Sequence, residues 1–156
     1  MRENLFRGKR RDNGEWVYGS LFVGFKKSYI CPEAIAMYNF DGALCLGGFI
    51  EVDPSTVGQY VLNDNNGKMI FEGDIIKADN GKQSDISVVK FGEYYPKLFF
   101  AMLDICCTGV QHLNANGFYL ESTKHEDMIL FKSRHIEVIG NVHDNPDLLL
   151  ESKEEK

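Results

Sequence analysis

Short alternating runs of apolar and polar residues, each ended by a turn signal, occupy most of the chain. Residues 16–23 (WVYGSLFV) follow the turn signal DNGE at 12–15. Asn-Gly supplies the positive φ that a tight hairpin requires, so residues 4–24 are predicted to form a β-hairpin. The period of two along a strand places Trp16 and Tyr18 on the same face of this hairpin.

Further short runs lie on both sides of the polar segment 63–67 (NDNNG). In the first half, the predicted strands are residues 28–31, 49–52 and 57–61. In the second half, they are residues 69–71, 74–78, 86–91 and 136–142. Residues 33–40 fit either a strand or a short helix. Many short strands joined by tight turns predict a mainly β protein, and the second half has the punctuation of a small barrel.

Residues 94–135 do not follow this pattern. The apolar run at 98–103 comes after Pro96, and periodicity cannot decide between a strand and a helix for such a run. We therefore predict an irregular insertion between the flanking strands.

The polar segment 63–67 marks a predicted boundary, near residues 61–68, between two lobes of the chain, and a charged tail follows the second lobe. The predicted parts are an N-terminal β-rich lobe (residues 1–62), a barrel unit (63–150) and a charged tail (151–156). Pro146, with Asn145 as its N-cap, is placed to begin a short helix near the C-terminus.

Composition and charge narrow the function classes. The chain has 156 residues, 44% of them hydrophobic, and a formal net charge of -6. Residues 1–30 nevertheless carry seven Lys/Arg against three acids. An overall acidic chain disfavours general binding to phosphates. No apolar run is long enough for a membrane span and no secretory signal is present, so a cytoplasmic protein with reduced cysteines is expected, and no membrane partner.

Four blocks together resemble the YopX family of phage and prophage proteins. They lie at residues 6–21, 52–60, 64–77 and 136–149, in the order that the family has. The resemblance implies a mostly β protein with an SH3-like barrel in its second half, encoded on phage or prophage DNA, and a homo-oligomer is expected. It carries over no catalytic residues, and residues 94–135 depart from the family pattern.

Basic and aromatic residues of the N-terminal hairpin form the best candidate binding site. The six residues are Arg7, Lys9, Arg10, Arg11, Trp16 and Tyr18. Cations beside aromatic rings can hold single-stranded nucleic acid by charge and stacking. The alternative is an exposed hairpin whose cations discourage unwanted strand pairing.

Acids and histidines provide weaker candidates. Asp64, Glu72 and Asp74 surround turns, and a structural role is favoured: Asp64 starts an Asx-turn and Asp74 brackets the turn at Gly73. The four histidines, His112, His125, His135 and His143, show no triad spacing. The cysteines lack paired zinc-ligand spacing. No catalytic residue, metal or cofactor is predicted.

Three function classes follow from these observations. The first is a non-enzymatic phage or prophage accessory protein, a β module that binds itself or another phage or host protein. The second is a nucleic-acid-binding module that uses the basic hairpin. The third is an enzyme of unknown class.

Overall fold

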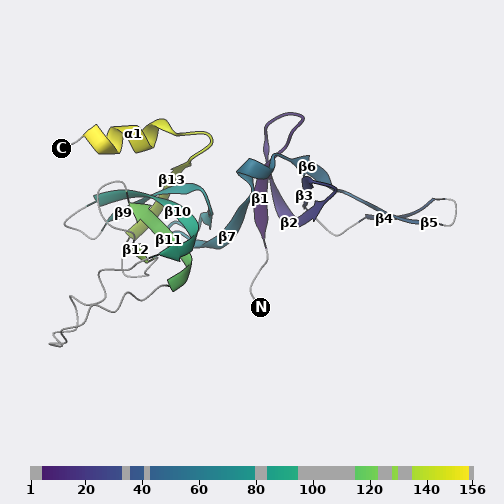
Figure 1. The fold of residues 1–156 in the computed structure, drawn as a ribbon, viewed down its shortest axis with the longest axis horizontal. Helices are drawn as coiled ribbons and strands as arrows, with labels where there is room; N and C mark the ends of the chain where they lie inside the picture. The colour runs from purple at the N-terminus through teal and green to yellow at the C-terminus, as the bar shows by residue number, and fades with distance from the viewer. Residues whose placement is uncertain are drawn as a thin grey trace. The chain divides into compact units, whose positions relative to one another are not determined.

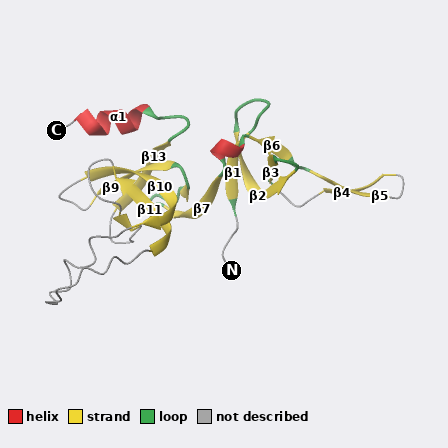
Figure 2. Cartoon of the chain, in the orientation of Figure 1, coloured by secondary structure: helices red, strands yellow, loops and turns green. Residues whose placement is uncertain are grey.

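A computed structural model describes residues 5–32, 36–40, 43–79, 84–94, 115–122, 128–129 and 135–154. Within these ranges the chain is almost entirely β, with one 3-10 turn and one short α-helix (Figure 1, Figure 2). This confirms the predicted mainly β class. The contacts within the chain divide it into two compact units, Met1–Tyr60 and Val61–Lys156.

The first unit holds seven described strands, of which the last continues into the second unit. They are β1 (Phe6–Lys9), β2 (Trp16–Gly24), β3 (Lys27–Cys31), β4 (Ala36–Phe40), β5 (Ala43–Gly47), β6 (Ile50–Val52) and, after the 3-10 turn η1 (Pro54–Thr56), β7 (Gly58–Asn63). β4 and β5 pair with each other as a separate two-stranded hairpin. The segment 33–40, for which a strand or a helix was predicted, is therefore a strand from Ala36 onward.

The second unit continues the chain through six described strands and the helix. They are β8 (Met69–Phe71), β9 (Asp74–Asp79), β10 (Ser84–Tyr94), β11 (Ala115–Ser122), β12 (Met128–Ile129), β13 (His135–Asn141) and α1 (Asp147–Glu154). The predicted short C-terminal helix is confirmed. It extends through Glu154, four residues into the segment predicted as a tail.

Two antiparallel sheets organise these strands. The first has the order β6-β3-β2-β1-β7-β8, and the second has the order β12-β11-β10-β9-β13. Among the described residues no pairing joins β12 to β13, so the second sheet is an open row there and the predicted SH3-like barrel is not confirmed. Most of the predicted insertion at 94–135, including the run at 98–103, lies outside the described residues.

The core of the first unit forms on the inner face of β2, β3 and β6. Val17, Ile30 and Val52 are buried together, and further apolar side chains pack against them: Phe6, Leu21, Ile50 and Val57. β2 requires a glycine at its centre, because a Cβ on Gly19 would lie 2.0 Å from the carbonyl oxygen of Cys31. That close approach allows β2 and β3 to pair along their length.

The core of the second unit lies on one face of β9, β10, β11 and β13. Its buried members are Ile70, Ile76, Ala78, Val89, Leu120, Ile136 and Val138, with Val61, Leu62 and Phe118 packed against them. β13 pairs with β9 through a register shift between Val138 and Gly140, which is the mark of a β-bulge.

Candidate functional site

Four of the six predicted site residues lie together on one face of the β1–β2 hairpin. Arg7 pairs with Tyr18 across the strands, and Lys9 pairs with Trp16. Directly opposed residues of an antiparallel pair share a face. The Arg7 guanidinium carbon lies 4.6 Å from the centre of the Trp16 ring, and Lys9 Nζ lies 5.5 Å from it. The structure therefore places two cations within cation–π range of one indole.

Burial separates the members of this group. Arg7 is only 6% exposed and Trp16 is half-buried, whereas Tyr18 is 41% exposed. A guanidinium at this depth packs within the protein rather than extending towards a ligand in solvent. The contacts between Arg7, Lys9 and Trp16 thus stabilise the strand pair, and Tyr18 is the member that a partner can reach.

Arg10 and Arg11, the other two predicted site residues, lie in the turn after β1 and form ion pairs with acids. Arg10 Nε donates to Asp12 Oδ1 at 2.9 Å, and its Nη2 donates to Asp12 Oδ2 at 2.6 Å. This bidentate geometry is the strongest arrangement of an arginine and a carboxylate. The hydrogen bond raises the pKa of Arg10 and lowers the pKa of Asp12.

Glu51 on β6 binds two cations at once. Arg11 Nη1 donates to Glu51 Oε1 at 3.1 Å, and Lys27 Nζ donates to Glu51 Oε2 at 2.7 Å. The hydrogen bond from Lys27 lowers the pKa of Glu51 most, and that from Arg11 adds to it. The backbone N–H of Arg11 also donates to the Glu51 carbonyl, at 3.1 Å. We call Arg11, Lys27 and Glu51 the carboxylate bridge.

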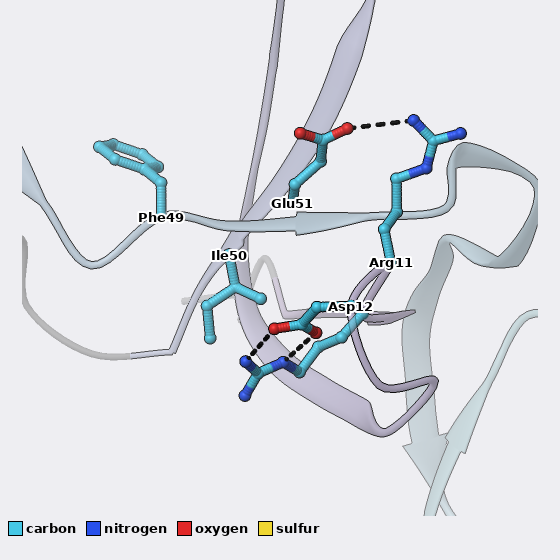
Figure 3. A pocket seen from close by; sticks show the side chains of 6 residues that line it. Arg11, Asp12, Phe49, Ile50 and Glu51 are labelled. Carbon is cyan, nitrogen blue, oxygen red and sulfur yellow. Dashed lines mark hydrogen bonds and ion pairs between the residues drawn. The ribbon is translucent and has the colours of Figure 1, made fainter.

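A shallow pocket of about 410 Å³ lies beside the carboxylate bridge (Figure 3). Its lining residues come from the turn after β1 and from β6 with the residue before it: Arg10, Arg11, Asp12, Phe49, Ile50 and Glu51. Phe49 and Glu51 point to the same side of the strand, and the Arg11 side chain extends towards Glu51 (Figure 3). One side of the pocket therefore combines an aromatic ring with a charged group.

Exposed apolar side chains on β2 and its following turn were missed by the sequence reasoning. Phe22 is 52% exposed, Val23 67% and Phe25 97%. Leu21, Phe22 and Val23 form an unbroken apolar run, and since a strand shows successive side chains to opposite faces, such a run signals that both faces carry apolar groups.

The turn between β2 and β3 adopts an unfavourable backbone for its residues. Phe25 has φ of 52° and Lys26 has φ of 62°. Two-residue hairpin turns with positive φ at both positions favour Asn-Gly, and a bulky residue there costs free energy. The segment between Gly24 and Lys27 thus holds a nearly fully exposed phenylalanine in a disfavoured conformation.

Aromatic rings continue from β2 across β3 to the edge of β6. The Phe22 and Phe49 ring centres lie 5.4 Å apart, and those of Tyr29 and Phe49 lie 6.4 Å apart in an edge-on arrangement. We call Tyr18, Phe22, Tyr29 and Phe49 the aromatic face. It borders the carboxylate bridge, because Tyr29 pairs with Glu51 across β3 and β6.

Asp64 and Asp74 have the structural roles that were predicted. Asp64 Oδ1 accepts hydrogen bonds from the backbone N–H groups of Asn66 and Lys68, at 2.9 and 2.8 Å, which confirms the Asx-turn. Its Oδ2 accepts from the N–H of Val138 at 3.2 Å. Burial raises the pKa of Asp64, but these backbone donors together lower it below its usual value.

The turn at Gly73 brings Asp74 back onto the strand before it. Asp74 is 1% exposed, and its Oδ2 accepts from the backbone N–H of Phe71 at 2.8 Å. This confirms that Asp74 brackets the turn. Glu72 is half-buried, and the loss of hydration raises its pKa.

Histidines and cysteines give no further constellation in the described part of the chain. His135 and His143 are exposed, and Cys31 is buried. His112, His125, Cys106 and Cys107 lie outside the described residues. Within the described ranges no group of three or more histidine, cysteine, aspartate or glutamate residues is placed to hold a metal ion. The described helix is too short and too polar to cross a membrane.

Comparison with known proteins identifies a family. The sequence profile of the YopX protein family matches residues 5–150, which is nearly the whole chain. The chain belongs to this family, as the four sequence blocks predicted. No curated protein and no solved structure gives a significant match.

Proposed function

We propose that this member of the YopX family is a non-enzymatic binding module that contacts another protein through its aromatic face and the turn after β2. The observation that carries the proposal is the exposure of large aromatic side chains: Tyr18 and Phe22, which share one face of β2, and Phe25 in the turn. Scattered exposed apolar residues need no explanation, but Phe22 packs against Phe49, which in turn packs against Tyr29, and a group of neighbouring rings marks an interaction surface. Aromatic side chains are also the ones that contribute most at protein interfaces.

The charges beside this surface favour a protein partner over nucleic acid. Arg10 is engaged with Asp12, and Arg11 and Lys27 share Glu51. A surface that binds the phosphate backbone gains affinity from cations that release counterions. Cations already paired with carboxylates contribute less to that gain, and the carboxylates repel phosphate.

Nucleic-acid binding is the second candidate, and one observation favours it. Arg7 and Lys9 lie against Trp16, and the exposed Tyr18 ring lies on the same face. An exposed ring beside cations can stack a base. If this candidate is right, the full chain binds single-stranded DNA or RNA with an affinity that falls as salt rises. Binding that is insensitive to salt excludes it.

An enzyme of unknown class is the third candidate and the least supported. The acids that first suggested chemistry, Asp64 and Asp74, accept hydrogen bonds from backbone N–H groups of their own turns. Carboxylates that accept such hydrogen bonds stabilise the turns in which they lie. The proposal therefore assigns no catalytic residue and no cofactor to this chain.

The family also supports three finer proposals. We propose that the protein is encoded by a phage or prophage and acts in the bacterial cytoplasm, that it self-associates, and that its second unit is an SH3-like barrel. Packing of Ile70, Val61 and Leu62 on the core face of the second sheet supports the barrel. Light scattering that finds only the 17.7 kDa species at every concentration would contradict self-association.

Photo-crosslinking in bacterial cells tests the main proposal. A benzoylphenylalanine is placed at Tyr18 or Phe25 in the full chain, and at Leu150 as a control, because Leu150 is 61% exposed on α1. We expect adducts of defined protein mass from the first two positions, and fewer from the third. The adducts should survive nuclease treatment.

The same experiment separates the candidates. An adduct of two copies of the chain identifies self-association, and another mass identifies a different protein. Adducts that disappear with nuclease favour nucleic acid. Equal yields at Leu150, Tyr18 and Phe25 would show that neither the aromatic face nor the turn after β2 is the contact surface.

A further inference from the structure

We infer that the carboxylate bridge and the adjoining end of the aromatic face bind an acidic peptide segment, in which an apolar side chain lies next to a carboxylate. The inference rests on the proposed protein-binding function and names the chemistry of the partner at one part of the surface. Three features carry it: an apolar wall, a pair of cations that share one acid, and a pocket between them.

The apolar wall consists of Phe22, Tyr29 and Phe49. The ring of Phe49 contacts both of the others. Phe22 is 52% exposed, and Phe49 also lines the pocket. A ring or branched side chain from a partner that packs here covers apolar surface that is otherwise in water, which is favourable.

The cations of the carboxylate bridge exceed its acids by one. Arg11 and Lys27 both donate to Glu51. Their side chains are 59% and 48% exposed, so both can be reached from solvent. Arg11 uses one terminal nitrogen for Glu51, and a guanidinium has five N–H donors. A second carboxylate can therefore bind Arg11 beside Glu51 or in its place.

Glu51 acts as an internal carboxylate that holds this cation pair until a partner arrives. Exposed ion pairs of this kind contribute little free energy, so exchanging one carboxylate for another costs little. The partner gains where it also covers Phe49, two residues before Glu51 and on the same side of the strand (Figure 3). The pocket of about 410 Å³ has room for one apolar side chain of the partner peptide.

The charge of the site favours a carboxylate over a phosphate. Two acids, Asp12 and Glu51, line the pocket with Arg10 and Arg11. With Lys27 added, the site carries one net positive charge, which matches a monoanion. A phosphate monoester carries nearly two negative charges at neutral pH, and the two neighbouring carboxylates repel it more.

Chemical-shift titration of the full chain tests the inference with a defined probe. The probe is N-acetylphenylalanine, which joins an aromatic ring to a carboxylate, and its amide is the uncharged control. We expect shifts at the Arg11 side chain and at the Phe49 and Glu51 amides, with a dissociation constant on the order of 1 mM. The amide should bind at least about fivefold more weakly because it lacks the ion pair.

Two substitutions in the site should move the affinity in opposite directions. Arg11→Gln should weaken binding about tenfold, because it removes a charged donor. Glu51→Gln should strengthen it roughly twofold to fivefold, because it removes the competing carboxylate. The matched controls are Lys90→Gln and Glu121→Gln, which break an exposed ion pair in the second unit with the same changes of charge. They should leave the affinity unchanged.

Several results would overturn the inference. It fails if neither the natural chain nor Glu51→Gln binds the probe, or if Arg11→Gln binds as the natural chain does. It also fails if thymidine monophosphate binds more tightly than the aromatic carboxylate, because the site would then prefer a phosphate. Protein adducts from Phe25 in cells, together with no binding of the probe, would refute this site but leave the proposed function standing.

Discussion

Two sets of turns differ in how far their side chains are exposed to solvent. One set holds Asp64 and Asp74, and the other is the turn between β2 and β3. Asp64 and Asp74 are buried and accept hydrogen bonds from backbone N–H groups. Phe25 is 97% exposed, and its backbone has a positive φ that disfavours it. The acids of the first two turns therefore have hydrogen-bond donors within the fold, whereas the turn between β2 and β3 exposes an apolar side chain to water.

The difference shows where a binding function is to be sought. Asp64 also covers the edge of β13: its Oδ2 accepts from the Val138 N–H, and Asn65 Oδ1 accepts from the Ile136 N–H at 2.7 Å. Exposed strand edges invite unwanted pairing, and these side chains occupy N–H groups that a neighbouring strand would otherwise use. The acids at these turns thus stabilise the fold, while the exposed apolar residues of β2 are the candidates for binding a partner.

The largest expected effect is that of a substitution at Asp74, which tests whether this buried acid stabilises the fold. Asp74→Ala removes the acceptor of the Phe71 N–H in a buried turn. Leaving a buried donor without an acceptor costs about 3 kcal/mol in the free energy of unfolding. Urea denaturation measures it. Lys77→Ala, at an exposed position of the same strand, is the control and should cost less than about 0.5 kcal/mol.

A change at Asp64 should cost somewhat less and should show itself in the pH dependence. Backbone donors lower the pKa of Asp64 in the folded protein. A carboxyl whose folded pKa is depressed adds stability above its unfolded pKa, and this is lost as the pH falls through the folded pKa. Stability should therefore fall below about pH 4.

Asp64→Asn isolates this contribution. It retains one oxygen acceptor but cannot be ionised, so it should cost about 2 kcal/mol at pH 7 and much less at pH 2. Denaturation at both pH values measures the difference between the natural chain and the variant. If the difference in the free energy of unfolding is as large at pH 2 as at pH 7, Asp64 stabilises the turn without any contribution from its charge.

Local sequence signals predicted the features that depend on neighbouring residues. Asn13-Gly14 indicated the first hairpin, the period of two placed Trp16 and Tyr18 on one face, and Asp64 before Asn66 indicated an Asx-turn. Each involves residues a few positions apart, whose geometry the backbone dictates. For this reason the strands and turns could be predicted without the structure.

Features that depend on distant pairing could not be predicted. Arg11 meets Glu51 across 40 residues of sequence, and Asp64 meets Val138 across 74. Spacing along the chain contains no information about such contacts. The six residues predicted as one basic and aromatic site therefore fall into two groups: Arg10 and Arg11 form ion pairs in the turn after β1, and the other four lie on the hairpin around Trp16. The turn at Phe25 was missed because it lacks the usual turn residues.

The turn between β2 and β3 offers a substitution that should stabilise the protein. Replacing Phe25 by Asn and Lys26 by Gly installs the sequence that this backbone favours. We expect a gain of about 1 kcal/mol in the free energy of unfolding, because a bulky residue with positive φ is replaced. The same variant should lose its partner adducts when the crosslinker is at Tyr18.

Lys26→Gly alone is the matched control for this prediction. It relieves part of the strain but retains the Phe25 side chain, so it should be stabilised by about half as much and keep its adducts. A double variant that is less stable than the natural chain would show that Phe25 contributes to the fold. In that case the turn between β2 and β3 would stabilise the fold, as the turns at Asp64 and Asp74 do.

The smallest expected effect is at Lys27, in the carboxylate bridge. Lys27→Gln leaves Arg11 paired with Glu51, and both ion pairs are exposed. Such pairs contribute little, so the melting temperature should change by less than about 2 °C, and added salt should reduce the difference further. A fall of more than about 5 °C would show that the bridge is structural, like the Asp64 turn. Glu51 would then not be free to exchange with the carboxylate of a partner, and the contrast between the two regions would hold only for the apolar side chains.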